Sequence, residues 1–119
     1  MNDVSTPMMG VLEKFLDVTS QRHKLVVSNI ANIDTPGYHT KDLDFRGELV
    51  RAVSSGDENV LPVARSVTGL LERPDGNNVS MDREGLLLAE TQMQFGLGVQ
   101  LLQHEFHNLM SAINEGGKG

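Results

Sequence analysis

The chain of 119 residues contains no cysteine and no tryptophan, and aromatic residues make up only 4% of it. Without cysteine there is neither a disulfide framework nor a thiolate zinc site. Large aromatic side chains supply much of the buried area of a compact core, so their scarcity favours an elongated core. The length is that of a single domain.

Basic clusters and long apolar runs are also missing. The net charge is −6 at pH 7, and the sequence contains no cluster of basic residues that could neutralise phosphates. Both observations argue against a nucleic-acid partner. No apolar stretch is long enough to span a bilayer. Residues 1–10 lack the layout of a cleavable signal peptide, so export from the cytoplasm would need another route.

The first amphipathic segment covers residues 7–33 and predicts a helix roughly 40 Å long. Ser5, Thr6 and Pro7 offer a capping hydroxyl followed by proline, which is acceptable in a first turn. A polar run at residues 19–24 would weaken a solitary helix pair but could face partners in a larger bundle. The seam positions recur in steps of three and four, the period of coiled-coil packing, and are Met9, Leu12, Leu16, Thr19, His23, Val26, Ile30 and Ile33.

This segment ends in a strong stop. Thr35 precedes Pro36 and is therefore pushed out of the α region, and Pro36 with Gly37 suits the centre of a type II turn. We expect the helix to end between Asn32 and Asp34, with Asn32 in the left-handed conformation that few other non-glycine residues tolerate.

The far end of the chain repeats the pattern more strongly. Residues 80–115 predict a helix roughly 50 Å long, capped by Ser80 and followed by a flexible tail at 116–119. Gly96 and Gly98 lie off its seam, where they indicate either close approach of another backbone or a local kink. The seam positions are Leu88, Gln92, Phe95, Val99, Leu102, Phe106, Leu109 and Ile113.

The segment between the helices, residues 34–79, resembles neither of them. We expect a short amphipathic turn or helix within 43–53, short strands at 61–64 and 67–71, and a turn at 73–78. So few apolar residues would leave the region loosely ordered unless something packs against it. The predicted fold class is mainly α: an elongated coiled coil of the N- and C-terminal helices, with a small irregular, β-containing middle segment.

Candidate chemical groups are weak. His104, Glu105 and His107 superficially resemble a zinc-protease helix, but that motif places its histidines four residues apart and here they are three apart. Asp42 and Asp44 are better interpreted as a solvated face or a local turn bond than as an acid–base pair. No phosphate loop or nucleophile signature is present, so we predict no catalytic, cofactor-binding or metal-binding residue and no enzyme activity.

The exit from the first helix carries a resemblance. Residues 29–32, 35–38 and 42–45 resemble the N-terminal signature of the rod, hook and related axial proteins of the bacterial flagellum. The turn at 75–79 followed by Glu84 is most similar to the proximal rod proteins of that family. The motif residues are Asn29, Asn32, Thr35, Pro36, Gly37 and Tyr38.

The resemblance implies a structural role. Such proteins pair their terminal helices into a coiled coil that packs beside neighbouring subunits in a helical tube, with the middle segment outside. They are exported through the flagellar type III export gate without a cleaved signal peptide and form the rod in the periplasm. The implied partners are copies of the chain, other proximal rod proteins, the adaptor FliE, the export gate and the membrane ring, with no small-molecule substrate or cofactor.

The seam residues are the candidates for packing between subunits. We also expect His23 to contact a neighbouring chain, and Tyr38 to lie either at a subunit boundary with its hydroxyl in water or in a contact within the chain. The candidate packing residues are Leu12, Leu16, Val26, Ile30, Phe95, Val99, Leu102, Phe106, Leu109 and Ile113.

A competing hypothesis uses the same seams. A soluble helical-hairpin adaptor or secretion chaperone would bind client helices through them. Such a protein has no need for the exit motif of residues 32–38, and it should form a stable folded dimer by itself.

Overall fold

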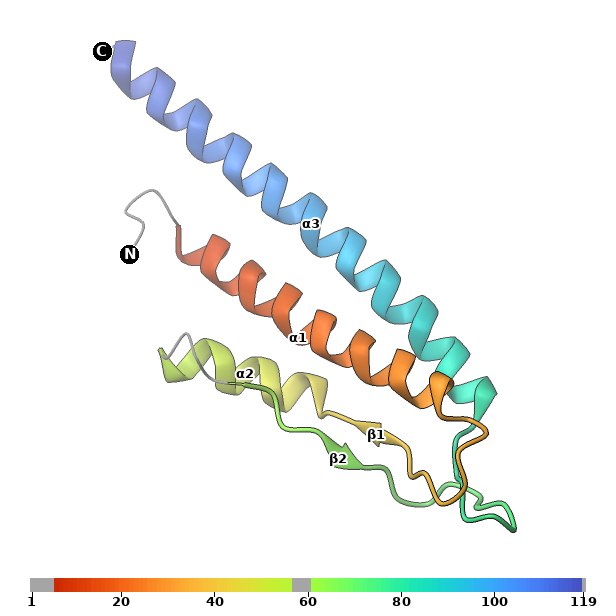
Figure 1. Ribbon diagram of the computed structural model, residues 1–119. Helices are drawn as coiled ribbons and strands as arrows, with labels where there is room; N and C mark the ends of the chain where they lie inside the picture. The colour runs from red at the N-terminus through yellow and green to blue at the C-terminus, as the bar shows by residue number, and fades with distance from the viewer. Residues whose placement is uncertain (1–5, 57–60, 119) are drawn as a thin grey trace.

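Two long helices from opposite ends of the chain lie side by side and antiparallel in the computed structural model, which describes residues 6–56 and 61–118 (Figure 1). The molecule measures 71 × 26 × 18 Å. A short third helix packs against the first. These features confirm the predicted mainly α, elongated fold. The elements are α1 (Pro7–Ala31), β1 (Lys41–Asp42), α2 (Phe45–Ser55), β2 (Arg65–Ser66) and α3 (Met81–Lys118).

Helix α1 begins as its capping residues predict. Thr6 Oγ1 accepts a hydrogen bond from the Met9 N–H at 3.1 Å, and Pro7 occupies the first turn, where it sacrifices no helical hydrogen bond. At the other end Asn32 caps the helix with φ −103°, so the left-handed conformation predicted for it is wrong. Its side chain instead donates to the Ser28 carbonyl at 2.8 Å, which satisfies an end-of-helix acceptor.

The predicted turn follows. Gly37 has φ 75°, and the Tyr38 N–H donates to the Thr35 carbonyl at 3.2 Å, as in a type II turn with Pro36 and Gly37 at its centre. The chain therefore reverses direction within a few residues and returns along α1.

Helix α3 starts where Ser80 Oγ accepts a hydrogen bond from the Arg83 N–H at 3.2 Å. It continues to Lys118, so residues 116–118 are helical and not the predicted tail; Gly119 lies outside the described residues. A glycine weakens a helix without ending it unless the residues after it form a left-handed capping turn.

The middle segment contains the expected short helix, α2. Asp44 caps it by accepting from the Gly47 N–H at 3.3 Å, and Gly56, with φ 71°, ends it in the left-handed conformation. Phe45 fastens α2 to α1, because its ring packs edge-on against Phe15 with centroids 5.6 Å apart.

The strands differ from the prediction. The residues of β2 lie between the predicted strands 61–64 and 67–71, and β2 pairs antiparallel with β1, placing Lys41 opposite Ser66. Leu61 is 75% exposed and Leu71 is 91% exposed. A strand needs a paired neighbour, and among the described residues the ladder is limited to β1 and β2, although the Val67 N–H donates to the Thr40 carbonyl at 2.9 Å.

The interior is as polar as it is apolar. Among the described residues, the buried apolar side chains are Leu12, Val18, Leu43, Val26, Ala52, Val79 and Leu87, and the buried polar ones are Thr19, Asn29, Thr40, Glu48, Asn77, Asn78, Glu84 and Thr91. Hydrogen bonds therefore carry much of the specificity of this fold. None of the described helices combines the length and apolar character needed to cross a bilayer.

Candidate assembly interface

The contact between α1 and α3 runs along buried positions that we call the inner seam. On α3 three of these positions lie just before a residue of the seam predicted from periodicity: Leu87 is buried where Leu88 was expected, Thr91 where Gln92 was expected, and Gly98 where Val99 was expected. The apolar period therefore marks a neighbouring face of α3. The inner seam consists of Leu12, Thr19, Val26 and Asn29 on α1 and Glu84, Leu87, Thr91 and Gly98 on α3.

Gly98 explains how closely the two helices meet. A Cβ placed on it would lie 2.7 Å from Leu16 Cδ2 and 3.0 Å from Phe15 Cδ1, so a side chain at this position would collide with α1. Around Gly96 nothing outside its own helix lies within 4 Å of such a Cβ. Close approach therefore accounts for Gly98 alone, and it is made by side chains and not by a backbone.

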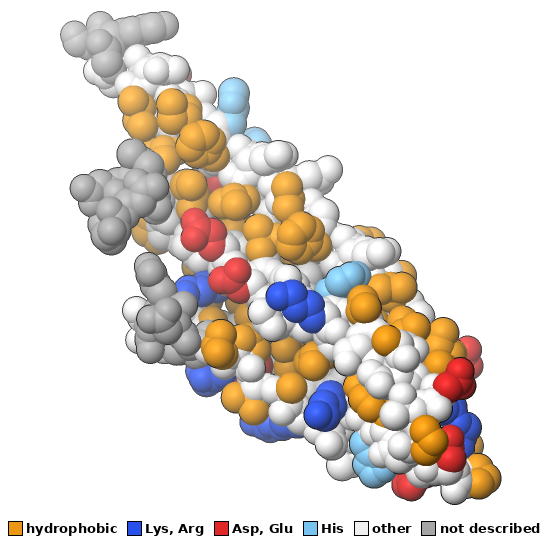
Figure 2. All heavy atoms as spheres, in the orientation of Figure 1, with side chains coloured by type: hydrophobic (Ala, Val, Ile, Leu, Met, Phe, Trp, Pro, Cys, Tyr) orange, Lys and Arg blue, Asp and Glu red, His pale blue; other side chains and the backbone are white. Residues whose placement is uncertain are grey.

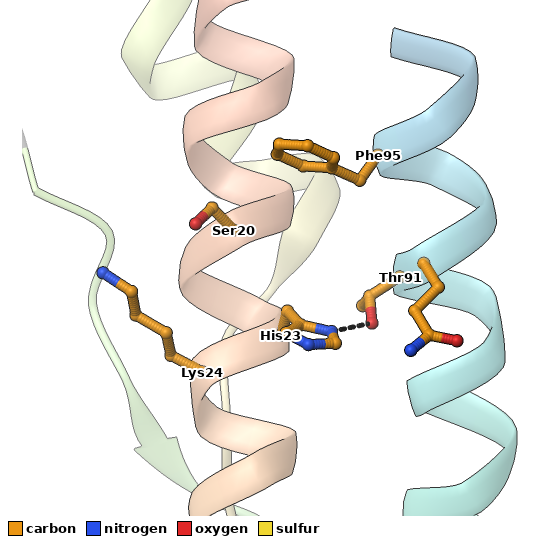
Figure 3. Close-up of a pocket in the computed structure, with 6 residues that line it drawn as sticks. Ser20, His23, Lys24, Thr91 and Phe95 are labelled. Atoms are coloured by element: carbon orange, nitrogen blue, oxygen red, sulfur yellow. Dashed lines mark hydrogen bonds between the residues drawn. The ribbon is translucent and has the colours of Figure 1, made fainter. Parts of the chain in front are cut away.

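The polar run of α1 is used within the chain. Thr19 Oγ1 donates to the Phe15 carbonyl at 2.7 Å, and His23 Nδ1 lies 2.9 Å from Thr91 Oγ1 across the inner seam (Figure 3). The contact of His23 is therefore with α3 of its own chain, where a neighbouring chain was expected. A cavity of about 390 Å³ opens beside this pair and is lined by Ser20, His23, Lys24, Thr91, Gln92 and Phe95.

The candidate packing residues of α3 form a second face, which we call the outer strip: Phe95, Val99, Leu102, Phe106, Leu109 and Ile113. Phe95 and Phe106 are each 45% exposed and Ile113 is 48% exposed; the other three are half-buried. Figure 2 shows apolar side chains open to solvent along the visible face of the molecule. The residues that the structure describes therefore cover the strip only in part.

Part of the outer strip extends past the N-terminal end of α1. Thr6 Oγ1 donates to Glu105 Oε1 at 3.3 Å, which places the start of α1 beside Glu105. Residues 106–118, which we call the overhang, continue past this point for roughly 20 Å at 1.5 Å per residue (Figure 1).

The candidate packing residues of α1 are less exposed, and so less available for contact with another subunit, than those of α3. Leu12 and Val26 are 9% and 1% exposed and belong to the inner seam, so their contacts are made inside the chain. Leu16 and Ile30 are half-buried. On α1 the periodic pattern therefore found mainly the intrachain contact, whereas on α3 it found mainly the open face.

The motif residue Asn29 is fully buried and uses both ends of its amide. Its Nδ2 donates to the Lys41 carbonyl and to Glu84 Oε1, each at 2.8 Å. Its Oδ1 accepts from the Lys41 N–H and from the Tyr38 hydroxyl, each at 3.1 Å. This one side chain joins the end of α1 to β1 and to the head of α3, and the Tyr38 hydroxyl is bonded within the chain.

Asn77 holds the end of α1 from the opposite direction. Its Nδ2 donates to the carbonyls of Asn32 and Thr35 at 2.9 and 2.8 Å, and Arg73 donates to the Ile33 carbonyl. Sequence reasoning treated Asn77 only as a turn residue. The unsatisfied carbonyls at the end of the first helix were the available signal, because a buried helix end needs donors from elsewhere.

An ion cluster completes this end of the molecule. Arg22 binds Asp42 through two hydrogen bonds of 3.0 Å, and Arg83 reaches Asp42 at 2.6 Å and Glu84 at 2.7 Å. The expectation of a local bond holds in part, because Asp42 Oδ1 also accepts from the Leu43 N–H at 2.7 Å. The expectation of a solvated face is wrong, because Asp42 is half-buried and is bound by arginines from α1 and α3. Asp44, in contrast, makes the local cap of α2.

The arginines change the ionisation of Asp42. Burial by itself would raise its pKa, but hydrogen bonds from Arg22, the Leu43 N–H and Arg83 outweigh burial and hold the pKa of Asp42 below its usual range. The hydrogen bond to Asp42 likewise raises the pKa of Arg22. The ion cluster and the hydrogen-bonded side chains around the end of α1 together form a group that we call the polar clasp. Its members are Arg22, Asn29, Tyr38, Asp42, Asn77, Arg83 and Glu84.

No protein-family model matches the chain. Similarity to known proteins nevertheless extends over most of its length. A flagellar basal body rod protein FlgB of Cereibacter sphaeroides is 32% identical over 118 residues, which span 88% of this chain and 92% of that protein. The chain belongs to the FlgB family of flagellar basal body rod proteins.

Other FlgB proteins agree. Those of Escherichia coli and Salmonella typhimurium are 28% and 29% identical over 125 residues, which span 87% of this chain and 91% of each relative. The resemblance of the exit motif to flagellar rod proteins is thereby confirmed. A member of the FlgB family is a structural protein of the flagellum basal body and not an enzyme.

Proposed function

We propose that the chain is a structural subunit of the proximal rod, that it polymerises through its terminal helices, and that it links FliE and the export gate to the rest of the rod. The observation that carries the proposal is the outer strip of α3, a continuous apolar face that the chain leaves partly open. An open apolar strip of this kind marks a site of protein contact.

The overhang is the strongest part of this argument. Phe106, Met110 and Ile113 are 41–48% exposed, and α1 does not reach beside them. A helix end without a packing partner is marginal in water, because most helical stability in proteins comes from burial of the apolar face. Contact with a neighbouring subunit would supply that burial and order the overhang at the same time.

The inferred neighbours are other copies of the chain and other proximal rod proteins, with FliE, the export gate and the membrane ring at the base. Repeated head-to-tail contacts between copies generate an open helical array, which is the geometry of a tube. The inferred location is the rod in the periplasm, reached through the flagellar type III export gate without cleavage of a signal peptide. No small-molecule substrate or cofactor is required for this role.

Charge substitutions on the overhang test the proposal. Phe106→Asp combined with Ile113→Asp places two carboxylates on the open strip without touching the inner seam, and it should abolish swimming and remove the chain from purified basal bodies. The matched control is His107→Asp with Asn114→Asp, at the adjacent exposed positions, which should leave both readouts near normal. Equal loss in both variants would sink the proposal.

A second measurement separates the rod subunit from an adaptor or chaperone. Far-ultraviolet circular dichroism of the purified chain is recorded over a concentration series, alone and with FliE and the other proximal rod proteins. A rod subunit should gain helicity or thermal stability only when those partners are added. A stable, highly helical dimer that is indifferent to them would favour the soluble helical-hairpin adaptor or secretion chaperone.

A further inference from the structure

Along and beside the inner seam, α1 and α3 meet through specific pairs in place of a continuous row of leucines. Two of these contacts are hydrogen bonds between side chains of the two helices, a third joins the cap of α1 to α3, and the fourth depends on a missing side chain. From the turn end to the open end they are Asn29–Glu84, His23–Thr91, Leu16–Gly98 and Thr6–Glu105.

The first pair, Asn29 and Glu84, depends most strongly on the alignment of the helices. Asn29 and Glu84 are both fully buried, and their hydrogen bond is 2.8 Å long. Glu84 keeps its bond to Arg83 and Asn29 keeps its bonds to Lys41 and Tyr38 when the pair separates. Glu84 Oε1, however, would be left buried without a hydrogen bond, so any other alignment of the helices that separates this pair is penalised. Apolar residues impose no such penalty, because one apolar contact of similar size replaces another.

We propose that Asn29 and Glu84 determine the register of α1 against α3. Single buried polar residues in coiled coils have this role: they select one alignment at some expense of stability. Replacing buried polar groups with apolar residues of similar volume often leaves stability unchanged or raises it. If this pair sets the register, its replacement should therefore keep the helices paired while the preference for one alignment is lost. The inference concerns contacts inside one chain and does not depend on the proposed function.

Register matters because it determines how much of α3 is left free. A shift of one heptad moves α3 along α1 by about 10 Å and lengthens or shortens the overhang by the same amount. The buried pair thereby sets the extent of the apolar surface presented at the open end of the molecule.

The absence of native cysteine allows a direct test by cross-linking of the full chain. Thr91→Cys is combined with His23→Cys, which reports the observed register, or with Leu16→Cys or Ile30→Cys, which report a shift of one heptad in either direction. The three α1 positions share one helix face at intervals of about 10 Å, beyond the separation that a disulfide spans. A short thiol-bridging reagent is applied to each pair and the cross-linked fraction is measured.

In the otherwise unaltered chain we expect the 23–91 link to dominate. With Asn29→Leu and Glu84→Leu added, helicity should be kept, while the summed 16–91 and 30–91 links should rise at least about tenfold, equivalent to about 1.4 kcal/mol of lost discrimination. The conservative Glu84→Gln keeps an acceptor for Asn29 and should retain the 23–91 link. The control Ala31→Leu with Gly85→Leu adds apolar groups at exposed positions and should also retain it.

Three results would overturn the proposal. A 23–91 link that stays dominant in the leucine variant would place the register elsewhere in the fold. Loss of helicity together with all links would make the buried pair a requirement for helix pairing and not for its alignment. Absence of the 23–91 link in the unaltered background would mean that register is not set within the chain.

Discussion

Alanine substitutions at two neighbouring glycines test how α1 and α3 meet. Gly96 and Gly98 both lie inside α3, where alanine is favoured over glycine by about 1 kcal/mol. Gly96 is exposed, and a Cβ there has nothing within 4 Å outside its own helix. Gly96→Ala should therefore stabilise the fold by about 0.5–1 kcal/mol and raise Tm by about 2–6 °C.

Gly98→Ala has the same gain in helix propensity but meets α1. Its Cβ would lie 2.7 Å from Leu16 Cδ2 and 3.0 Å from Phe15 Cδ1. Leu16 is half-buried and can rotate away, whereas the Phe15 ring is held edge-on by Phe45. Overpacking costs about 1–3 kcal/mol, so Gly98→Ala should be destabilising by about 0–2 kcal/mol.

Urea titrations followed by far-ultraviolet circular dichroism measure both variants against the parent chain. The two alanines should differ by about 1–3 kcal/mol in the free energy of unfolding, with unchanged denaturant slopes. Each variant is the control for the other, because the substitution, the helix and the propensity term are shared. Equal stabilisation by both alanines would refute the close contact at Gly98.

Two further predictions concern the ion cluster. Asp42→Asn removes the carboxylate shared by Arg22 and Arg83, and it should lower the free energy of unfolding measured in urea by about 2–4 kcal/mol. The control Asp44→Asn should change that free energy little, because asparagine caps a helix as well as aspartate does. Similar losses in both variants would contradict a stabilising role for the ion cluster. The lowered pKa of Asp42 makes its contribution complete above the unfolded-state value of about 3.9, so stability should fall as the pH drops from about 5 through the folded pKa. Melting curves recorded from neutral to acidic pH should show a smaller fall in Tm for Asp42→Asn than for the parent chain. Glu48 contributes to the fall in Tm that remains, because its pKa is lowered chiefly by the hydrogen bond from Arg51. Identical falls in Tm would rule out Asp42 as a contributor.

Short-range features of the fold were predictable because their causes are local. Thr6 with Pro7, Pro36 with Gly37, and Ser80 act on backbone groups within four residues, so their effect does not depend on the rest of the chain. The two long helices follow from apolar periodicity over many turns. The exit motif also indicated the family, and the similarity of the chain to FlgB proteins shows that it belongs to that family.

Tertiary structure decided which face of each helix meets which partner. Periodicity counts apolar residues, so it selected the outer strip of α3 and passed over an inner seam whose contacts depend on Thr91, Glu84 and the missing side chain of Gly98. The arginine partners of Asp42 lie 20 and 41 residues away in sequence, beyond the reach of any local pattern. The sequence by itself determined where the helices begin and turn, because those signals are local. Their register and the polar clasp arise only when distant segments fold together and buried polar groups must find partners.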